Sequence, residues 1–270
     1  MRVPTKAFWN LFFVAIFVVA VGLVQPAKAA DWSNTIAAAT LGNDLYTIEK
    51  AGALYRVNLS TGAWVQVGKA DFAGTRMLFA GPKNLFTIEG DGSLYRIDPS
   101  NGSWARVGKA GEWKNTIAGA FSGTRLFTVE SGGALYGTNP VNGVWAQIGK
   151  AEFGGTKRLL GSDIGLLSLE SDGSLYWINQ TNGTWGRLGK AGEWKNTIAA
   201  TLSVSTLYTI ESGGALYATN AATGAWKQIG KPDFKNTMFL FYANGSLYTI
   251  EKGGLYAVNA LNGSWIHIDI

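Results

Sequence analysis

Short apolar segments separated by polar turns run through the chain from about residue 35 to its end. The first four occupy residues 35–41, 45–49, 54–58 and 63–67, and Gly, Asn, Asp and Ser stand between them. Alternating apolar residues over about five positions, bounded by such turn residues, are typical of β-strands and hairpins. No segment keeps a 3.6-residue period over ten or more positions, which helical repeats require. The pattern therefore predicts four short antiparallel strands.

This four-strand unit is repeated through the chain. The segment LYTIEKAGALYRVN and its five relatives begin at Leu45, Leu85, Leu126, Leu166, Leu207 and Leu247, in steps of 40 or 41 residues. Four strands in about 40 residues form one blade of a β-propeller. We predict an all-β fold, a six-bladed β-propeller with four-stranded antiparallel blades. The predicted blades cover approximately residues 31–70, 71–110, 111–151, 152–191, 192–232 and 233–270.

Two kinds of repeat alternate, which supports an even number of blades. Repeats one, three and five carry the small-residue stretches WSNTIAA, WKNTIAG and WKNTIAA, whereas repeats two, four and six carry the bulkier FAGTRMLF, FGGTKRLL and FKNTMFLF. A ring of two alternating blade types closes without a mismatch only when the number of blades is even. We expect small and large side chains to interdigitate on the strands next to the axis.

The N-terminus has the features of a secretory signal peptide. Arg2 and Lys6 precede an apolar run over residues 11–24, and Ala27-Lys28-Ala29 matches the small-x-small cleavage pattern. The run is shorter than the ~20 residues that cross a bilayer. We expect residues 1–29 to be the signal peptide, cleavage after Ala29, a secreted or periplasmic protein, and no membrane span after cleavage. An uncleaved membrane anchor is the alternative.

Composition narrows the possible functions. The chain has 36 Gly, no Cys and one His, so disulfides, thiol catalysis and multi-histidine metal sites are excluded. Loss of Arg2, Lys6 and Lys28 with the signal peptide lowers the formal net charge from +5 to +2. Such a weak charge does not favour a nucleic-acid partner. No motif indicates a cofactor, and we expect none.

Repeated charged and aromatic residues are predicted to share one face of the propeller. Strands are named a to d from the axis outward; because neighbours are antiparallel, the b–c turns and the d–a crossovers between blades lie on the same face. A Glu begins each b–c turn: Glu49, Glu89, Glu130, Glu170, Glu211 and Glu251. Each crossover carries an acid, then an aromatic residue, then Thr three positions later; the aromatic residues are Trp32, Phe72, Trp113, Phe153, Trp194 and Phe234. The a–b turns on the other face vary freely.

These residues suit sugar recognition, in which an apolar ring face stacks on an aromatic ring and hydroxyls form directional hydrogen bonds. We select the six Glu, the six crossover aromatic residues, and Asn115 and Asn196 as candidate ligand-binding residues. A structural role stays open for each series. Glu can bridge to a crossover Lys or accept backbone N–H bonds, the aromatic rings can act as wedges between blades, and Thr can cap the crossover turn. The Trp of each outer strand is assigned mainly to packing between blades.

The sequence resembles the tachylectin-2-like β-propeller lectins. The resemblance lies in GKAGEWKNTIA at 108–118, GALYRVN at 52–58 and AWVQVGK at 63–69, and it extends over all six repeats. It implies binding of N-acetylated hexosamines such as GlcNAc and GalNAc in pockets between neighbouring blades. The six blades, the shorter repeats and the absence of a long Pro-rich c–d loop depart from the family pattern.

The leading hypothesis is therefore a multivalent lectin without catalytic activity, with glycans as partners. Alternatives are a scaffold that binds proteins or the cell envelope through the same face, and a glycoside hydrolase using a Glu pair. The acids recur in every blade, which suits several similar binding sites better than one reaction centre. Because the first crossover lacks the Gly-Lys of the others, we expect five strong sites and one that is impaired or absent. We also expect Trp113→Ala to remove about one site while the fold survives.

Overall fold

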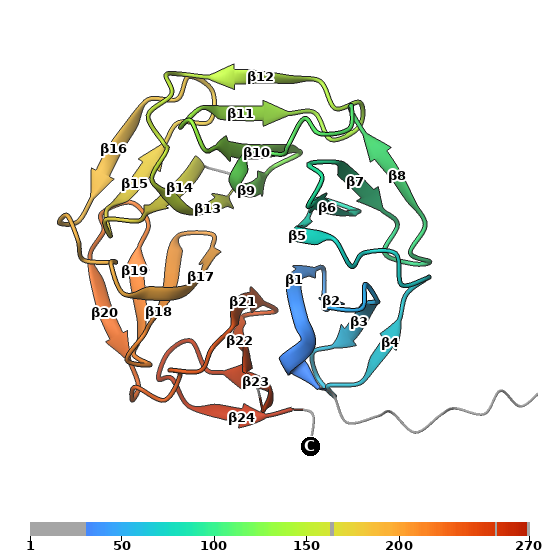
Figure 1. The fold of residues 1–270 in the computed structure, drawn as a ribbon. Helices are drawn as coiled ribbons and strands as arrows, with labels where there is room; N and C mark the ends of the chain where they lie inside the picture. Colours follow the sequence, from blue (N-terminus) through green and yellow to red (C-terminus); the bar gives the residue numbers. More distant parts are fainter. Residues whose placement is uncertain (1–30, 163–164, 252, 269–270) are drawn as a thin grey trace, which may run out of the picture.

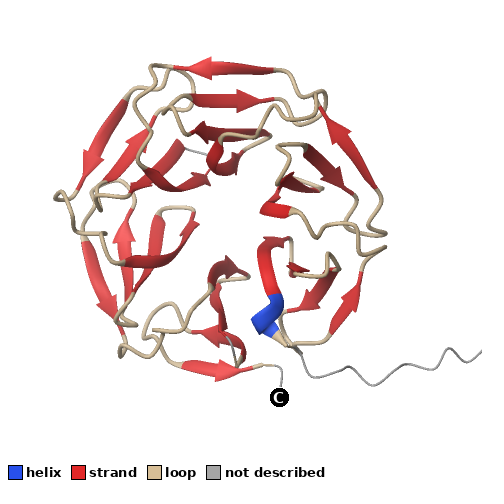
Figure 2. Cartoon of the chain, in the orientation of Figure 1, coloured by secondary structure: helices blue, strands red, loops and turns tan. Residues whose placement is uncertain are grey.

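Six four-stranded sheets stand around a central axis in the computed structural model of the protein (Figure 1). The structure describes residues 31–162, 165–251 and 253–268. In every sheet the strand order follows the sequence from the axis outward, and all pairs are antiparallel. The prediction of a six-bladed β-propeller is confirmed. Apart from the 3-10 helix η1 (Trp32–Asn34), the described residues form strands, turns and loops (Figure 2).

The strand bounds repeat from blade to blade. The first three blades contain β1 (Thr35–Leu41), β2 (Asp44–Glu49), β3 (Leu54–Asn58) and β4 (Trp64–Gln66); β5 (Thr75–Ala80), β6 (Leu85–Glu89), β7 (Leu94–Ile97) and β8 (Trp104–Val107); and β9 (Thr116–Ser122), β10 (Arg125–Glu130), β11 (Leu135–Thr138) and β12 (Trp145–Ile148). The last three contain β13 (Thr156–Ser162), β14 (Gly165–Glu170), β15 (Leu175–Ile178) and β16 (Trp185–Leu188); β17 (Thr197–Ser203), β18 (Thr206–Glu211), β19 (Leu216–Asn220) and β20 (Trp226–Ile229); and β21 (Phe239–Ala243), β22 (Ser246–Glu251), β23 (Gly254–Val258) and β24 (Trp265–His267).

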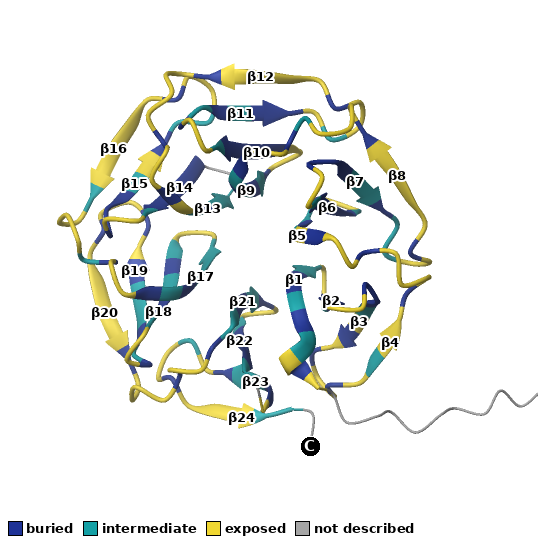
Figure 3. Cartoon of the chain, viewed as in Figure 1, coloured by how far each residue is buried: buried dark blue, intermediate teal, exposed yellow. Residues whose placement is uncertain are grey.

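Burial decreases from the second strand of each blade to its outer strand (Figure 3). The b strands are almost entirely buried because both of their faces pack against neighbouring blades; in β2, five of six residues are buried. The d strands have only one hydrogen-bonded neighbour and are mostly exposed, as in β12. This gradient explains why the b strands read as nearly continuous apolar runs and the d strands do not.

The ring of blades is closed by side-chain packing, because each sheet contains only the four consecutive strands of its own blade. One core cluster joins Ile48 and Leu54 of the first blade to Leu85 and Ile97 of the second. An equivalent cluster joins the sixth blade to the first and contains the fully buried Trp32. The first and sixth blades are therefore held together by the same kind of apolar contacts that hold consecutive blades.

The innermost strands alternate as predicted. Gly119 of β9 lies so close to the Phe79 ring of β5 that a Cβ at that glycine would come within 2.8 Å of the ring. Ala and Gly on one strand thus leave the space that Phe and Leu of the next strand fill. The predicted signal peptide lies outside the described residues, and no helix in the described part of the chain is long and apolar enough to span a membrane.

Candidate functional site

Each crossover is tied to two b–c turns on one face of the propeller. The backbone N–H of Trp113 donates to the carbonyl oxygen of Gly92 in the preceding blade, at 2.9 Å, and Ser131 N–H donates to the carbonyl oxygen of Asn115, also at 2.9 Å. Equivalent bonds join Phe153 to Gly133 and Ser171 to Gly155. The predicted clustering of crossovers and b–c turns on one face is therefore confirmed.

The Glu and Thr series meet at these turns. The Thr hydroxyl that starts strand a donates to the Glu that ends strand b in five blades: Thr35 to Glu49 at 2.8 Å, Thr75 to Glu89 at 2.8 Å, Thr116 to Glu130 at 2.6 Å, Thr156 to Glu170 at 2.9 Å and Thr237 to Glu251 at 3.3 Å. In the fifth blade, the Thr197 hydroxyl is buried without a partner among the described residues. In these five blades the Glu side chain thus has a structural partner, which is a Thr hydroxyl.

Burial also changes the acidity of four of these carboxyl groups. Desolvation raises the pKa of Glu49, Glu89, Glu170 and Glu251, while hydrogen bonds from Thr or Ser hydroxyls partly oppose the rise. A carboxyl group with a raised pKa stays protonated to a higher pH. When it is protonated it can donate a hydrogen bond to a ligand hydroxyl, and when it is ionised it can accept one.

The crossover aromatic rings lie in the core. Trp32, Phe72, Trp113, Phe153, Trp194 and Phe234 are only 0–4% exposed. Trp113 packs with Ile88 and Leu94 of the preceding blade, which is the wedge role left open by the sequence. Ring faces buried to this extent offer little area on which a sugar could stack. Trp113 and Phe153 nonetheless line one pocket each.

Most of the exposed Trp rings belong to the outer strands, contrary to the expectation that these Trp residues pack between blades; Trp177 of β15 is also exposed. Trp104, Trp145, Trp185, Trp226 and Trp265 are 45–50% exposed. Burial fails here because the d strand is the sheet edge and no further strand covers it. The signal in the sequence was a large aromatic residue recurring at the start of an otherwise polar edge strand.

A crossover carboxylate holds each of these indoles. The Trp Nε1–H donates to the acid 32 or 33 positions earlier: Trp104 to Asp71 at 3.0 Å, Trp145 to Glu112 at 3.4 Å, Trp185 to Glu152 at 2.8 Å, Trp226 to Glu193 at 3.3 Å and Trp265 to Asp233 at 3.3 Å. A strand c Tyr also packs edge-on against the indole, for example Tyr136 against Trp145 with centroids 5.1 Å apart. The indole is thus held by two neighbours, with ring surface left open.

These groups surround a pocket in the third blade and another in the fourth. The first has a volume of about 310 Å³ and is lined by Trp145, Tyr136, Glu112, Glu130 and Trp113, among others. The second, of about 290 Å³, is lined by the equivalent Trp185, Tyr176, Glu152, Glu170 and Phe153. Each pocket is formed by one blade and the crossover that enters it. Volumes near 300 Å³ lie at the lower end of the range for small-molecule sites.

The two candidate Asn residues occupy equivalent, exposed positions in the third and fifth blades. Asn115 is exposed and lines the pocket of the third blade. Asn196, its equivalent in the fifth blade, is also exposed, and its carbonyl oxygen accepts the N–H of Ser212. Glu130 and Glu170 of the pockets were selected from the sequence. The crossover acids Glu112 and Glu152 and the tyrosines were not, because only the tertiary structure brings strands c and d over the crossover.

The first blade differs from the others. Trp64 is half-buried and stacks on Trp32, with centroids 5.6 Å apart. Asp31, which corresponds to the crossover acids, accepts hydrogen bonds from Ser33 and Asn34 at the start of η1. The expectation of one impaired site rests on this blade and stays a prediction.

Within the described part of the chain, no three or more His, Asp or Glu residues are grouped so that they could hold a metal ion. Comparison with known proteins yields no matching family model and no matching curated protein.

Solved structures share the fold. The computationally designed Ika8 protein superposes with a TM-score of 0.54 and 16% identity over 86% of this chain and 72% of its own. A structural genomics protein of unknown function from Bacteroides thetaiotaomicron gives 0.61 and 14% over 83% of this chain and 68% of its own. PorZ, a surface component of the type-IX secretion system of Porphyromonas gingivalis, gives 0.57 and 13% over 87% of this chain but 38% of PorZ. At these identities the likeness concerns the fold alone.

Proposed function

We propose that the protein is a secreted, non-catalytic lectin that binds glycans at several equivalent sites on the crossover face. The observation that carries this proposal is the exposed outer-strand Trp, held against a carboxylate at the rim of a pocket and repeated around the ring. The resemblance to tachylectin-2-like lectins favours N-acetylated hexosamines as ligands.

The chemistry of the pocket fits a sugar ring. The open face of Trp145 supplies an apolar stacking surface, and its hydrogen bond to Glu112 and contact with Tyr136 limit its motion. A ring fixed before binding loses less conformational freedom on binding. Glu130, Glu112 and Asn115 supply polar groups for hydroxyl and acetamido groups. Stacking on one side with hydrogen bonding on the other is the combination that amphipathic sugar rings require.

The repetition of the Trp–carboxylate pair is the second observation that supports a lectin. Five blades share the Trp–carboxylate pair, so one molecule offers several similar sites that face the same way. Multivalency of this kind raises avidity for a dense glycan surface by about 10²–10⁴ over a single site. One reaction centre, as a glycoside hydrolase needs, does not call for repetition of its acids in every blade.

Isothermal titration with GlcNAc, GalNAc and their polymers tests the proposal. Trp145→Ala removes an exposed ring, so we expect a folded protein whose stoichiometry falls by about one site. Trp177→Ala is the matched control, because Trp177 is also exposed but does not line either pocket. Trp113→Ala should instead lower the free energy of unfolding by about 3–5 kcal/mol, since its ring is buried.

Failure to bind any sugar on a glycan array would contradict the lectin proposal and favour the scaffold alternative. Equal stoichiometry in Trp145→Ala and Trp177→Ala would show that binding occurs elsewhere. Turnover of chromogenic glycosides that disappears in a single Glu→Gln variant would favour the hydrolase.

A further inference from the structure

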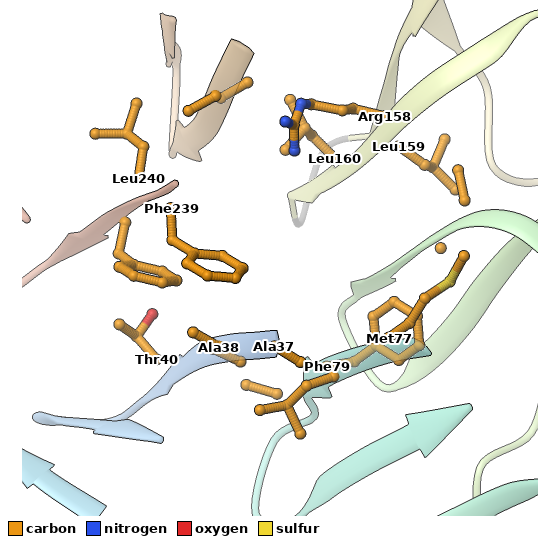
Figure 4. A pocket seen from close by; sticks show the side chains of 18 of the residues that line it. Ala37, Ala38, Thr40, Met77, Phe79, Arg158, Leu159, Leu160, Phe239 and Leu240 are labelled. Carbon is orange, nitrogen blue, oxygen red and sulfur yellow. The ribbon is translucent and has the colours of Figure 1, made fainter. Parts of the chain in front are cut away.

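A separate cavity lies on the propeller axis, away from the two crossover pockets. Its volume is about 420 Å³, and its walls come from the innermost strand of every blade (Figure 4). Met77, Phe79, Leu160 and Phe239 contribute large apolar side chains, and Ala38 contributes a small one (Figure 4). The cavity is large enough for a small organic molecule.

Arg158 interrupts this apolar lining. Met77, Arg158 and Phe239 are equivalent residues of the second, fourth and sixth blades; each stands two positions after the strand-initiating Thr and pairs with an Ile or Leu of strand b. Two of the three positions are apolar, so the fold does not require a charge there. Among the labelled side chains of Figure 4, Arg158 alone carries nitrogen.

The guanidinium of Arg158 has donors to spare. Its Nη2 donates to the carbonyl oxygen of Ile198 in β17, while its buried Nε has no hydrogen-bond partner in the described part of the chain. Burial lowers the pKa of Arg158, because charge is unfavourable where water is excluded. Arg158 is partly buried as a whole, so an unpaired charge and unfilled donors on its guanidinium cost free energy.

The remaining charges of the cavity are also positive. Arg76 and Lys157 line it, and both donate to backbone carbonyl oxygens: Arg76 to Lys114 at 2.9 Å and Thr116 at 2.8 Å, Lys157 to Thr197 at 2.8 Å. Among the described residues that line the cavity there is no Asp or Glu. The cavity is therefore cationic, and nothing among these residues neutralises Arg158.

We propose that the axial cavity binds a small organic carboxylate with an apolar body. The carboxylate would accept hydrogen bonds from the terminal N–H groups of the Arg158 guanidinium that Ile198 does not use, a charge-assisted pairing that Arg and carboxylates prefer. The apolar body would lie against Phe239, Phe79 and Leu160 and remove their surfaces from water. A bare inorganic anion would lose its hydration without gaining such contacts, so the apolar part determines selectivity.

Titration calorimetry with 4-phenylbutyrate, its neutral amide and inorganic phosphate tests the proposal. We expect wild-type protein to bind the carboxylate and to bind the amide and phosphate about tenfold or more weakly. Arg158→Met introduces the residue found at position 77, and loss of a charge-assisted hydrogen bond should weaken carboxylate binding about 10- to 100-fold. Arg106→Met is the matched control, because Arg106 is exposed on the outer strand β8.

Several outcomes would overturn the proposal: no binding by the wild-type protein, equal binding of the carboxylate and the amide, or unchanged affinity in Arg158→Met. If Arg158→Met fails to fold, carboxylate binding by Ala38→Leu tests the proposal instead. This change fills part of the cavity and leaves the guanidinium in place, so carboxylate binding should weaken; unchanged affinity would place the ligand elsewhere.

Discussion

At the scale of single residues, the repeats use side chains that serve the fold and the pocket together. Glu130 accepts the Thr116 hydroxyl at 2.6 Å and also lines the pocket of the third blade. Glu112 accepts the backbone N–H of Lys109 at 2.6 Å through one oxygen and the Trp145 indole through the other. A carboxylate with two oxygens can fasten a turn and still orient a neighbouring ring. The hydrogen bonds of these acids within the fold are enough to explain why they recur in each blade. The same acids can still contact a ligand in the pocket.

The carboxyl groups of the Glu series should make stability depend on pH. Burial raises the pKa of Glu89 above its ordinary value of 4.5, so its contribution to stability is fully present below about pH 4.5 and is lost as pH rises through the raised pKa. Glu89→Gln stays neutral at every pH. Urea unfolding should therefore show the stability of Glu89→Gln rising relative to wild type as pH increases from 4.5 to neutrality.

Asp98→Asn is the control with the opposite sign. Hydrogen bonds from Ser100 lower the pKa of Asp98 below 3.8, so its contribution is present above pH 3.8 and is lost as pH falls through the lowered pKa. Asn occupies the equivalent place in the other blades, as Asn58 and Asn139 do. If both variants followed the same pH dependence, the proposed causes of the two pKa shifts would be wrong.

At the scale of the element, the b–c turn is the joint that fixes one blade to the next crossover. Gly133 has φ +87°, and a Cβ there would come within 2.8 Å of the backbone nitrogen of Gly154. Its carbonyl oxygen accepts the N–H of Phe153 at 2.9 Å. Glycine is needed both for the positive φ and for this close approach of two backbones. The turn thereby determines where the crossover acid lies relative to the outer-strand Trp.

Adjacent glycines of one turn provide a direct test. Gly133→Ala should lower the free energy of unfolding by about 1–3 kcal/mol, because of the strained φ and the backbone clash. Gly132→Ala should change it by less than about 0.5 kcal/mol, since no atom lies within 4 Å of a Cβ at that position. Urea denaturation of both variants measures the difference. Similar destabilisation by both would contradict the role assigned to Gly133.

At the scale of the whole molecule, alternating blades fit around the axis and leave a cavity there. The small strands β1, β9 and β17 stand between the bulkier β5, β13 and β21 (Figure 1). Gly119 and Phe79 are an example of this fit between a small and a large side chain. Because neighbouring strands share one limited space, the size of a residue on one blade limits the size permitted on the next.

A double-mutant cycle checks this dependence between blades. Gly119→Ala should destabilise the protein by about 1–3 kcal/mol through overpacking against the Phe79 ring. Phe79→Leu should cost less in the Gly119→Ala background than in wild type, because it relieves the clash. Thermal unfolding of the two single variants and the double variant measures the coupling. Additive effects would mean that the two side chains do not share the space.

The sequence by itself determined the number of blades, their strands and the face on which the repeated acids lie. The two-residue alternation of a strand and the 40- or 41-residue repeat can both be recognised directly in the sequence. For this reason β1 and β3 begin and end where the pattern predicts. The tertiary structure decided which aromatic rings are open and which are buried. Each of the other five blades has a Trp or Phe at the position of Trp113 and a Trp at the position of Trp145. Nevertheless, the Trp113 ring is buried between blades, whereas the Trp145 ring is exposed on an edge strand. The position of Arg158 in an axial cavity likewise could not be predicted from the sequence, because the walls of that cavity come from six strands far apart in the chain.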